Sequence, residues 1–472
     1  MTQPSHRVPV PPEQRETLSY RLLRGVARLA VRWYYREVAF DGASRIPAGG
    51  PVLLVVNHPN ELMDAIFAGI IAPRQLTFTG KATLFANPAI GAFLRHMRVV
   101  PLRRVQDELA QAGGAALPDA ARNAQSFAAI HAALESGQMV LIFPEGRSWD
   151  EPRLAPIRTG TARIALSARQ AGVAGIAIVP VGINYEGKHS LRSRVLVEVG
   201  APILLDALPA EASTVDALTA EISRRLHAVT LNFTDDADAA EVLDVATVLA
   251  ATTDEVRPLD DPDAPIAAMV DVARRADAIR DRMARGDLPA PVQAHVVQVQ
   301  HRLLALRRTA TGLGIRLDDV ILDTGLPAAG RFVVRELLLA AVGVPLAMWG
   351  RLNHFLPFTL TRWLGRATAS AKSNLAMNTV VLGVLLVPSF YVLQTALVWW
   401  LTGGGWALAY AGLLIPSASW DIRYSERLRD LRMRARAWRA FRDDPGLQAR
   451  LRTELFALRD EAAAIATGVA AM

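Results

Sequence analysis

The stretch VLLVVNHPNELMD, residues 52–64, contains the two patterns that decide the fold around it. Its first five residues are apolar and rich in β-branched side chains, which predicts a short buried strand, and a helix-like run opens after it. Similar apolar runs recur along the chain, with helix-like stretches at residues 119–136 and 159–171; the runs lie at residues 139–143, 176–181 and 195–199. Strands that alternate with helices predict an α/β domain with a buried sheet over residues 41–205.

The chain before this domain divides into a tail and a helix. Residues 1–16 are polar and rich in proline, and they lack the charged-then-apolar layout of a signal peptide, so we expect the α/β domain to stay in the cytoplasm. Residues 17–40 predict an amphipathic helix, because apolar side chains from Leu18 to Trp33 recur at helical spacing and arginines share another face. Such a helix suits the membrane interface, and a surface helix packed on the domain is the alternative.

The chain after the domain becomes helical and then apolar. Residues 206–330 carry acidic, Ala-rich periodic segments separated by loops, which predict a helical accessory region. Residues 331–420 are strongly apolar, and the uncharged run Leu375–Leu401 is long enough to span a bilayer. A break follows this run, and then a second, shorter apolar leg. The pattern predicts a membrane hairpin over residues 375–416, kinked at Pro388.

The charges around this hairpin predict its orientation. Basic residues flank the apolar pair on both sides, which places both ends in the cytoplasm. Residues 421–472 predict a basic C-terminal helix that can lie on anionic lipid. We therefore expect a protein of the cytoplasmic membrane with its α/β domain on the cytoplasmic side. A pair of apolar helices buried inside the protein is the alternative.

Composition excludes several classes of chemistry. The chain has no cysteine, so disulfides, thiolate catalysis and cysteine-ligated metal centres are excluded. The nine histidines are scattered, and no phosphate-binding loop, dinucleotide fingerprint or hydrolase nucleophile elbow is present. We expect no metal, no cofactor and no nucleic-acid partner. The positive net charge reflects either an arginine-rich genome or attraction to anionic lipid and phosphate.

His58 and Asp64 are the candidate catalytic pair. They follow the strand at 52–56, and strand ends are where α/β domains present catalytic groups. A histidine with a carboxylate nearby can activate a hydroxyl: the imidazole takes the proton, and the carboxylate fixes the tautomer and stabilises the imidazolium.

Three further blocks lie at the ends of apolar runs. The first is FPEGRS, residues 143–148, where Glu145 and Arg147 can hold hydroxyl or phosphate groups and Gly146 allows close approach of a ligand. The second places the basic side chains Lys81 and Arg103 after apolar strands, as a phosphate-bearing acceptor requires. The third is IVPVG, residues 178–182, which contains Pro180.

In this order and spacing, the four blocks resemble the glycerolipid acyltransferase superfamily over roughly residues 40–205. The resemblance implies a mixed sheet flanked by helices, and a His–Asp pair that deprotonates an acceptor hydroxyl for attack on an acyl thioester. It makes His58 the base and Asp64 its orienting partner. The resemblance also places Arg103, Glu145 and Gly146 on acceptor-binding blocks, and Pro180 on a block that lines the pocket.

Two departures point to one branch of this superfamily. The His–Asp spacing is one residue longer than usual, which keeps Glu61 open as an alternative carboxylate, and Arg147 stands where a Thr is usual. Both features look like the fungal-type glycerol-3-phosphate and glycerone-phosphate acyltransferases and their bacterial relatives. Downstream residues such as Asn184-Tyr185 also resemble that branch, whereas Trp149 stands where the branch leads us to expect a His.

The resemblance implies the partners of the chain. They are an acyl thioester, carried by coenzyme A or by acyl-carrier protein, a glycerol-phosphate-type acceptor, and membrane lipid. We favour glycerol-3-phosphate or glycerone phosphate as the acceptor, with 1-acylglycerol-3-phosphate as the alternative. A catalytically inactive scaffold on a lipid surface is the non-enzymatic alternative, supported by the altered His–Asp spacing.

Overall fold

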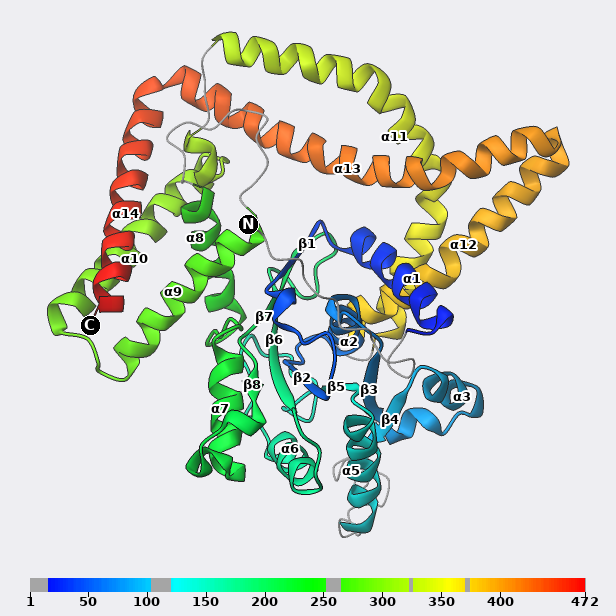
Figure 1. The fold of residues 1–472 in the computed structure, drawn as a ribbon. Coiled ribbons are helices and arrows are strands. Elements are labelled where there is room, and N and C mark those ends of the chain that lie inside the picture. Colours follow the sequence, from blue (N-terminus) through cyan, green and yellow to red (C-terminus); the bar gives the residue numbers. More distant parts are fainter. Residues whose placement is uncertain (1–15, 103–119, 252–264, 322–325, 370–373, 472) are drawn as a thin grey trace, which may run out of the picture. The chain divides into compact units, whose positions relative to one another are not determined.

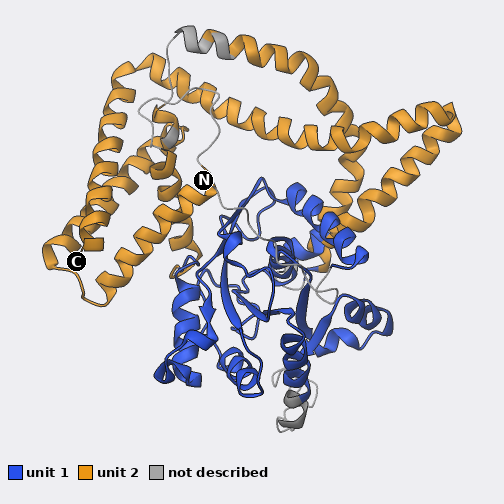
Figure 2. Cartoon of the chain, in the orientation of Figure 1, with its two compact units in different colours: residues 1–232, 369–380 blue, residues 233–368, 381–472 orange. Residues whose placement is uncertain are grey.

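The computed structural model describes residues 16–102, 120–251, 265–321, 326–369 and 374–471. The chain forms two compact units (Figure 2). Unit 1 comprises residues 1–232 and 369–380, and unit 2 comprises residues 233–368 and 381–472.

Unit 1 is built on one sheet. Its strands are β1 (Glu37–Asp41), β2 (Val52–Val56), β3 (Leu76–Lys81), β4 (Val99–Leu102), β5 (Met139–Ile142), β6 (Ala177–Tyr185), β7 (Arg194–Val199) and β8 (Ile203–Leu204). They lie in the order β1-β7-β6-β2-β5-β3-β4, with β8 beside β6 (Figure 1). Strands β6, β2, β5, β3 and β4 are parallel, whereas β7 and β8 pair antiparallel with β6. The sheet is therefore mixed, which confirms the predicted fold class.

Helices cover both faces of this sheet. The helices of unit 1 are α1 (Leu18–Tyr34), α2 (Glu61–Ile71), α3 (Pro88–His96), α5 (Ala120–Glu135), α6 (Gly160–Gln170) and α7 (Val215–His227), with short 3₁₀ helices η2 (Ala43–Arg45), η3 (Ala82–Phe85), η4 (Leu205–Ala207) and η5 (Ala210–Ser213). Alternate residues of β2 face opposite layers. Leu54 packs in one cluster with α1 and α2, and Leu53 packs in another with α5, α6 and α7. Burial on both faces explains why β2 reads as an uninterrupted apolar run.

The N-terminal helix is shorter than predicted. The helical pattern extended to residue 40, but α1 ends at Tyr34 and Glu37–Asp41 forms β1, an outer strand of the sheet. Tyr34 and Tyr35 are buried in the core below the sheet, which turns the chain from helix to strand. The sheet therefore begins before residue 41.

The end of the α/β unit also lies later than predicted. Residues 206–232, assigned from the sequence to the accessory region, belong to unit 1. Leu218 and Ile222 of α7 are buried in the same apolar cluster as β2 and α6, so packing of this helix completes the second helical layer.

Unit 2 is helical throughout its described residues. It contains α8 (Asp236–Ala251), α9 (Ile266–Ala284), α10 (Ala290–Gly312), η6 (Leu317–Ile321), α11 (Leu326–Thr368), most of α12 (Asn374–Thr402), α13 (Gly404–Asp443) and α14 (Pro445–Ala471). α12 and α13 meet at Gly403, within the break predicted for the hairpin. The second leg does not end near residue 416, because α13 continues without interruption into the basic segment. The predicted single C-terminal helix is instead the end of α13 followed by α14.

Two helical segments are long and apolar enough to cross a membrane, Val333–Thr368 and Leu375–Thr402. Their large apolar side chains point outward: Leu352 is 77% exposed and Trp400 is 80% exposed. Polar side chains lie between the helices. His354 of α11 is 1% exposed and its Nε2 lies 2.8 Å from the Tyr391 hydroxyl of α12, while the Gln394 side chain of α12 donates to the Asn353 carbonyl at 2.8 Å. This apolar-outside arrangement is expected of helices surrounded by lipid.

Candidate active site

The carboxyl ends of the parallel strands place the predicted blocks at one edge of the sheet. His58 follows β2, Glu145 follows β5, Lys81 ends β3, and Tyr185 ends β6. Because β2 lies between β6 and β5, groups from three neighbouring strands surround His58.

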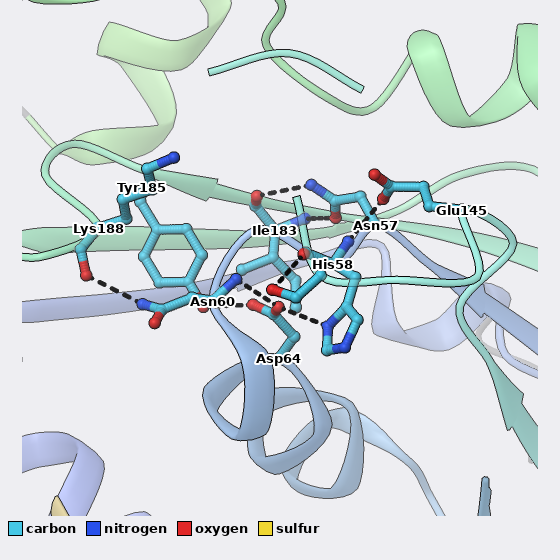
Figure 3. Close-up of polar contacts among 9 residues, drawn as sticks. Asn57, His58, Asn60, Asp64, Glu145, Ile183, Tyr185 and Lys188 are labelled. Atoms are coloured by element: carbon cyan, nitrogen blue, oxygen red, sulfur yellow. Dashed lines mark hydrogen bonds and ion pairs between the residues drawn. The ribbon is translucent and has the colours of Figure 1, made fainter. Parts of the chain in front are cut away.

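His58 and Asp64 form the predicted pair. The imidazole Nδ1 lies 3.0 Å from Oδ2 of Asp64 (Figure 3). A hydrogen bond between these atoms places the ring proton on Nδ1, so Nε2 is the nitrogen that can accept a proton from a substrate. The carboxylate that contacts the imidazole is thus that of Asp64, the residue preferred over Glu61 from the sequence.

The longer His–Asp spacing is absorbed by the backbone at Glu61. Helix α2 begins at Glu61, whose φ of 43° is in the left-handed region that non-glycine residues rarely adopt. This turn fits the extra residue between strand and helix, and Asp64, in the first turn of α2, still reaches the imidazole. The altered spacing therefore does not separate the pair.

Two more groups hold the Asp64 carboxylate. The backbone N–H of Asn60 donates to Oδ2 at 2.7 Å, and the hydroxyl of Tyr185 donates to Oδ1 at 2.7 Å. Asp64 is fully buried, and a buried carboxylate requires donors for its lone pairs. Burial, with the Asp64 charge as a second cause, raises the pKa of Tyr185 well above its ordinary value, so this hydroxyl keeps its proton.

The plane of the imidazole is fixed by Phe143. Its ring stacks on that of His58 with centroids 3.7 Å apart and an interplanar angle of 10°. Phe143 follows β5, so the FPEGRS block supports the histidine as well as shaping the turn.

Glu145 contacts backbone groups. Oε1 accepts the N–H of His58 at 2.7 Å and Oε2 accepts the N–H of Ala155 at 3.1 Å, and the residue is 3% exposed. Burial raises the pKa of Glu145 to about 7, although these two hydrogen bonds act to lower it. The sequence suggested a group that holds acceptor hydroxyls or phosphate. The contacts favour a residue that positions the loop carrying His58.

The conformation of Gly146 requires a glycine. Its φ is +72°, and a Cβ atom there would lie 2.9 Å from Cδ of Arg158. The next residue, Arg147, is exposed, and its guanidinium lies over the Trp149 ring at 4.1 Å from the centroid. Arg147 is thus a cation at the rim of the site.

The remaining predicted residues are placed differently. Lys81 is exposed at the end of β3. Pro180 is buried inside β6, in register with Val55 and so three residues short of the level of His58; it supports the sheet below the edge. Arg103 lies outside the described residues, and its role stays a prediction.

Sequence reasoning gave no role to several residues that build the site. The sequence marks Tyr185 only through its resemblance to the fungal-type branch, and Phe143 and Asn57 only as members of their blocks. The Asn57 side chain donates to the Ile183 carbonyl at 3.2 Å and accepts the Ile183 N–H at 2.8 Å, which joins the ends of β2 and β6. Their signal was their position at strand ends, next to the catalytic block in space.

Comparisons with known proteins point to one family. Residues 37–184 match the family model named Acyltransferase. Glycerol-3-phosphate O-acyltransferase 2 of Saccharomyces cerevisiae is 37% identical over 120 residues, 24% of this chain and 16% of the yeast protein. Lyso-ornithine lipid O-acyltransferase of Brucella abortus is 26% identical over 183 residues, 37% of this chain and 62% of that protein. The chain thus matches less than two thirds of the length of either relative.

Among the solved structures that match is the 1-acyl-sn-glycerophosphate acyltransferase of Thermotoga maritima, at 17% identity and a TM-score of 0.34, with 44% of this chain and 78% of that chain covered. The family model covers the segment that carries the His58–Asp64 pair. Residues 37–184 therefore form an acyltransferase domain, and this domain belongs to the glycerolipid acyltransferase superfamily, on the side of its fungal-type glycerol-3-phosphate branch.

Proposed function

We propose that the chain transfers a fatty acyl group from an acyl thioester to the hydroxyl of glycerol-3-phosphate or glycerone phosphate. The contact between Nδ1 of His58 and Asp64 carries this proposal, because it leaves Nε2 of the imidazole at the sheet edge as a general base. The intact pair argues against a catalytically inactive scaffold, the role that the altered spacing alone could have suggested.

The reaction follows from the roles of these groups. Nε2 of His58 takes the proton of the acceptor hydroxyl as its oxygen attacks the thioester carbonyl carbon. The tetrahedral intermediate then collapses: the C–S bond breaks, the new C–O ester bond remains, and the thiolate leaves and takes the proton from the imidazolium. Asp64 stabilises the imidazolium between the two steps. No metal or cofactor takes part in this scheme.

The phosphate of the acceptor needs cations near the same edge. Among the described residues, Lys81 and Arg147 are exposed there, and Arg103 follows β4 in the sequence. Arginine and lysine at these positions suit a phosphate monoester. The name of the yeast relative supports glycerol-3-phosphate, whereas the Thermotoga structure is named for a 1-acyl acceptor.

A matched assay tests the proposal. Purified full-length protein in detergent is given acyl-coenzyme A, and in parallel acyl-carrier protein thioester, with glycerol-3-phosphate, glycerone phosphate or 1-acylglycerol-3-phosphate, and each product is identified by chromatography. We expect 1-acylglycerol-3-phosphate or acyl-glycerone phosphate as product. Turnover of 1-acylglycerol-3-phosphate alone would show the alternative acceptor, and transfer to none of the three would refute the function.

The chain is associated with the membrane, and we propose that its catalytic domain faces the cytoplasm. The outward apolar side chains of α11 and α12 support lipid contact, and the basic residues at both ends of the predicted hairpin support a cytoplasmic location for those ends. Single cysteines at Thr368 and Ser425 test this topology, because the chain has no native cysteine. We expect both to react with an impermeant thiol reagent only in permeabilised cells. Labelling of either one from outside would exclude the hairpin.

A further inference from the structure

The carboxylate of Asp64 is held by three groups from two separate segments of the chain. His58 comes from the loop after β2, the Asn60 N–H from the end of that loop, and the Tyr185 hydroxyl from the end of β6, 121 positions away. Both His58 and Asn60 use Oδ2. Among the described residues, Tyr185 is therefore the group that holds the other carboxylate oxygen, Oδ1.

The ring of Tyr185 is itself fixed by packing. Its centroid lies 6.1 Å from that of Tyr35 and 6.1 Å from that of Phe67, and these rings belong to the core below the sheet. A ring held on two sides keeps its hydroxyl at one point in space. The hydroxyl thus gives Asp64 a hydrogen-bond donor whose position does not depend on the loop between residues 58 and 64.

A donor at a fixed position matters here because of the loop that leads to Asp64. Five residues separate His58 from Asp64, and this loop passes through the left-handed backbone of Glu61. Such a turned loop does not by itself fix the orientation of the carboxylate. A carboxylate bound only through Oδ2 can rotate about its Cβ–Cγ bond, and rotation would remove Oδ2 from the imidazole.

We propose that Tyr185 is a positioning residue, whose hydroxyl holds Oδ1 of Asp64 so that Oδ2 stays on Nδ1 of His58. This inference rests on the proposed function, in which His58 is the base. Tyr185 acts through Asp64 and has no contact with the reacting atoms in this scheme. Loss of its hydroxyl should lower the rate of the chemical step and leave the binding of both substrates unchanged.

Tyr35 provides a matched control. It is also a buried tyrosine, its ring contacts that of Tyr185, and its hydroxyl has no hydrogen-bond partner among the described residues. Tyr35→Phe and Tyr185→Phe each remove one buried hydroxyl and keep the ring. Only Tyr185→Phe removes a donor from Asp64.

The first measurement is kinetic, on purified full-length protein with acyl-coenzyme A and glycerol-3-phosphate. A hydrogen bond to a charged group corresponds to roughly 10- to 100-fold in rate. We expect Tyr185→Phe to lower kcat by about this factor, with the KM of both substrates within twofold, and Tyr35→Phe to match the wild type. Equal thermal unfolding midpoints for the two variants would exclude a general loss of fold. A Tyr185→Phe variant with wild-type kcat, or one altered only in KM, would overturn the proposal.

The second measurement does not depend on turnover. Proton NMR of histidine-labelled protein detects the Nδ1–H of His58 in its hydrogen bond, assigned by its loss in His58→Ala. We expect this resonance in the wild type and in Tyr35→Phe, and faster exchange with solvent in Tyr185→Phe. An unchanged resonance would refute positioning by Tyr185. The variants can show the expected NMR difference while the wild type acylates no acceptor. That result would refute the proposed function and support positioning by Tyr185.

Discussion

Glu145→Gln should remove the contribution of Glu145 to the pH dependence of protein stability. Burial raises the pKa of Glu145 to about 7 in the folded protein, from 4.5 for an unperturbed side chain. At about 1.4 kcal/mol for each unit of pKa, proton binding to Glu145 is more favourable in the folded protein than in the unfolded chain by about 3 kcal/mol. A raised carboxyl pKa stabilises the fold fully below pH 4.5, and this contribution is lost as the pH rises to 7.

The variant removes this dependence, because glutamine does not titrate in this range. The difference in unfolding free energy, wild type minus Glu145→Gln, should therefore fall by about 3 kcal/mol between pH 4 and pH 8 and stay constant above pH 8. Taking the difference between two proteins cancels the titration of groups that behave alike in both.

The activity of Glu145→Gln should fall, although its relative stability rises with pH. Glutamine has one carbonyl oxygen, so it can accept a hydrogen bond from His58 or from Ala155 and must present its NH₂ group to the other N–H. An unpaired buried donor costs about 1 to 3 kcal/mol, and the loop that carries His58 should shift. We expect a lower kcat at pH 8, where the variant gains most in relative stability.

Urea unfolding in detergent, monitored by tryptophan fluorescence at several pH values, measures the stability difference. A difference that stays flat from pH 4 to pH 8, or that grows with pH, would refute the reasoning, since it would mean that the two backbone N–H groups stabilise the carboxylate more than burial destabilises it. Wild-type activity in the variant would show that Glu145 does not position the loop.

Four further variants test the assigned roles. His58→Ala should lower kcat by ~10² to 10⁴ with the fold intact, since it removes the general base; retention of half the activity would exclude His58. Asp64→Asn should be severe and Glu61→Gln mild in the same assay, and the reverse order would move the pair to Glu61. Arg103→Ala should raise the KM for the phosphate acceptor and not for the acyl donor, at a cost of roughly 1.5 to 3 kcal/mol for the lost contact; an effect on the donor KM alone would place Arg103 near the thioester carrier.

The central part of the site could be predicted from the sequence because its signals are local. The strand at 52–56 is apolar on both faces, and His58 and Asp64 lie close behind it in the chain, so one window contains the strand, the turn and the pair. The apolar runs that became β5, β6 and β7 were equally clear. Their order in the sheet, and the antiparallel direction of β7, depend on contacts between distant segments that periodicity does not contain.

Boundaries were predicted less well where two elements share one pattern. No proline or glycine separates residues 35–40 from α1 in the sequence, and the pairing of β1 with β7 places these residues in the sheet. Helix α7 has an amphipathic sequence pattern like those of the helices of unit 2. Its apolar face packs on the sheet, and this choice of partner is a tertiary property.

The roles of Glu145 and Tyr185 show why a motif does not determine the function of its side chains. A glutamate in a strand-to-loop turn can face a ligand or the backbone, and the sequence is the same in both cases. In the fold its oxygens meet the N–H groups of His58 and Ala155. Tyr185 reaches Asp64 because β6 and β2 are neighbours in the sheet. Together the two residues hold His58 from β5 and Asp64 from β6, so the pair is braced by the strands on either side of β2. A longer loop between His58 and Asp64 is then tolerable, because the geometry of the pair depends on the sheet more than on the loop.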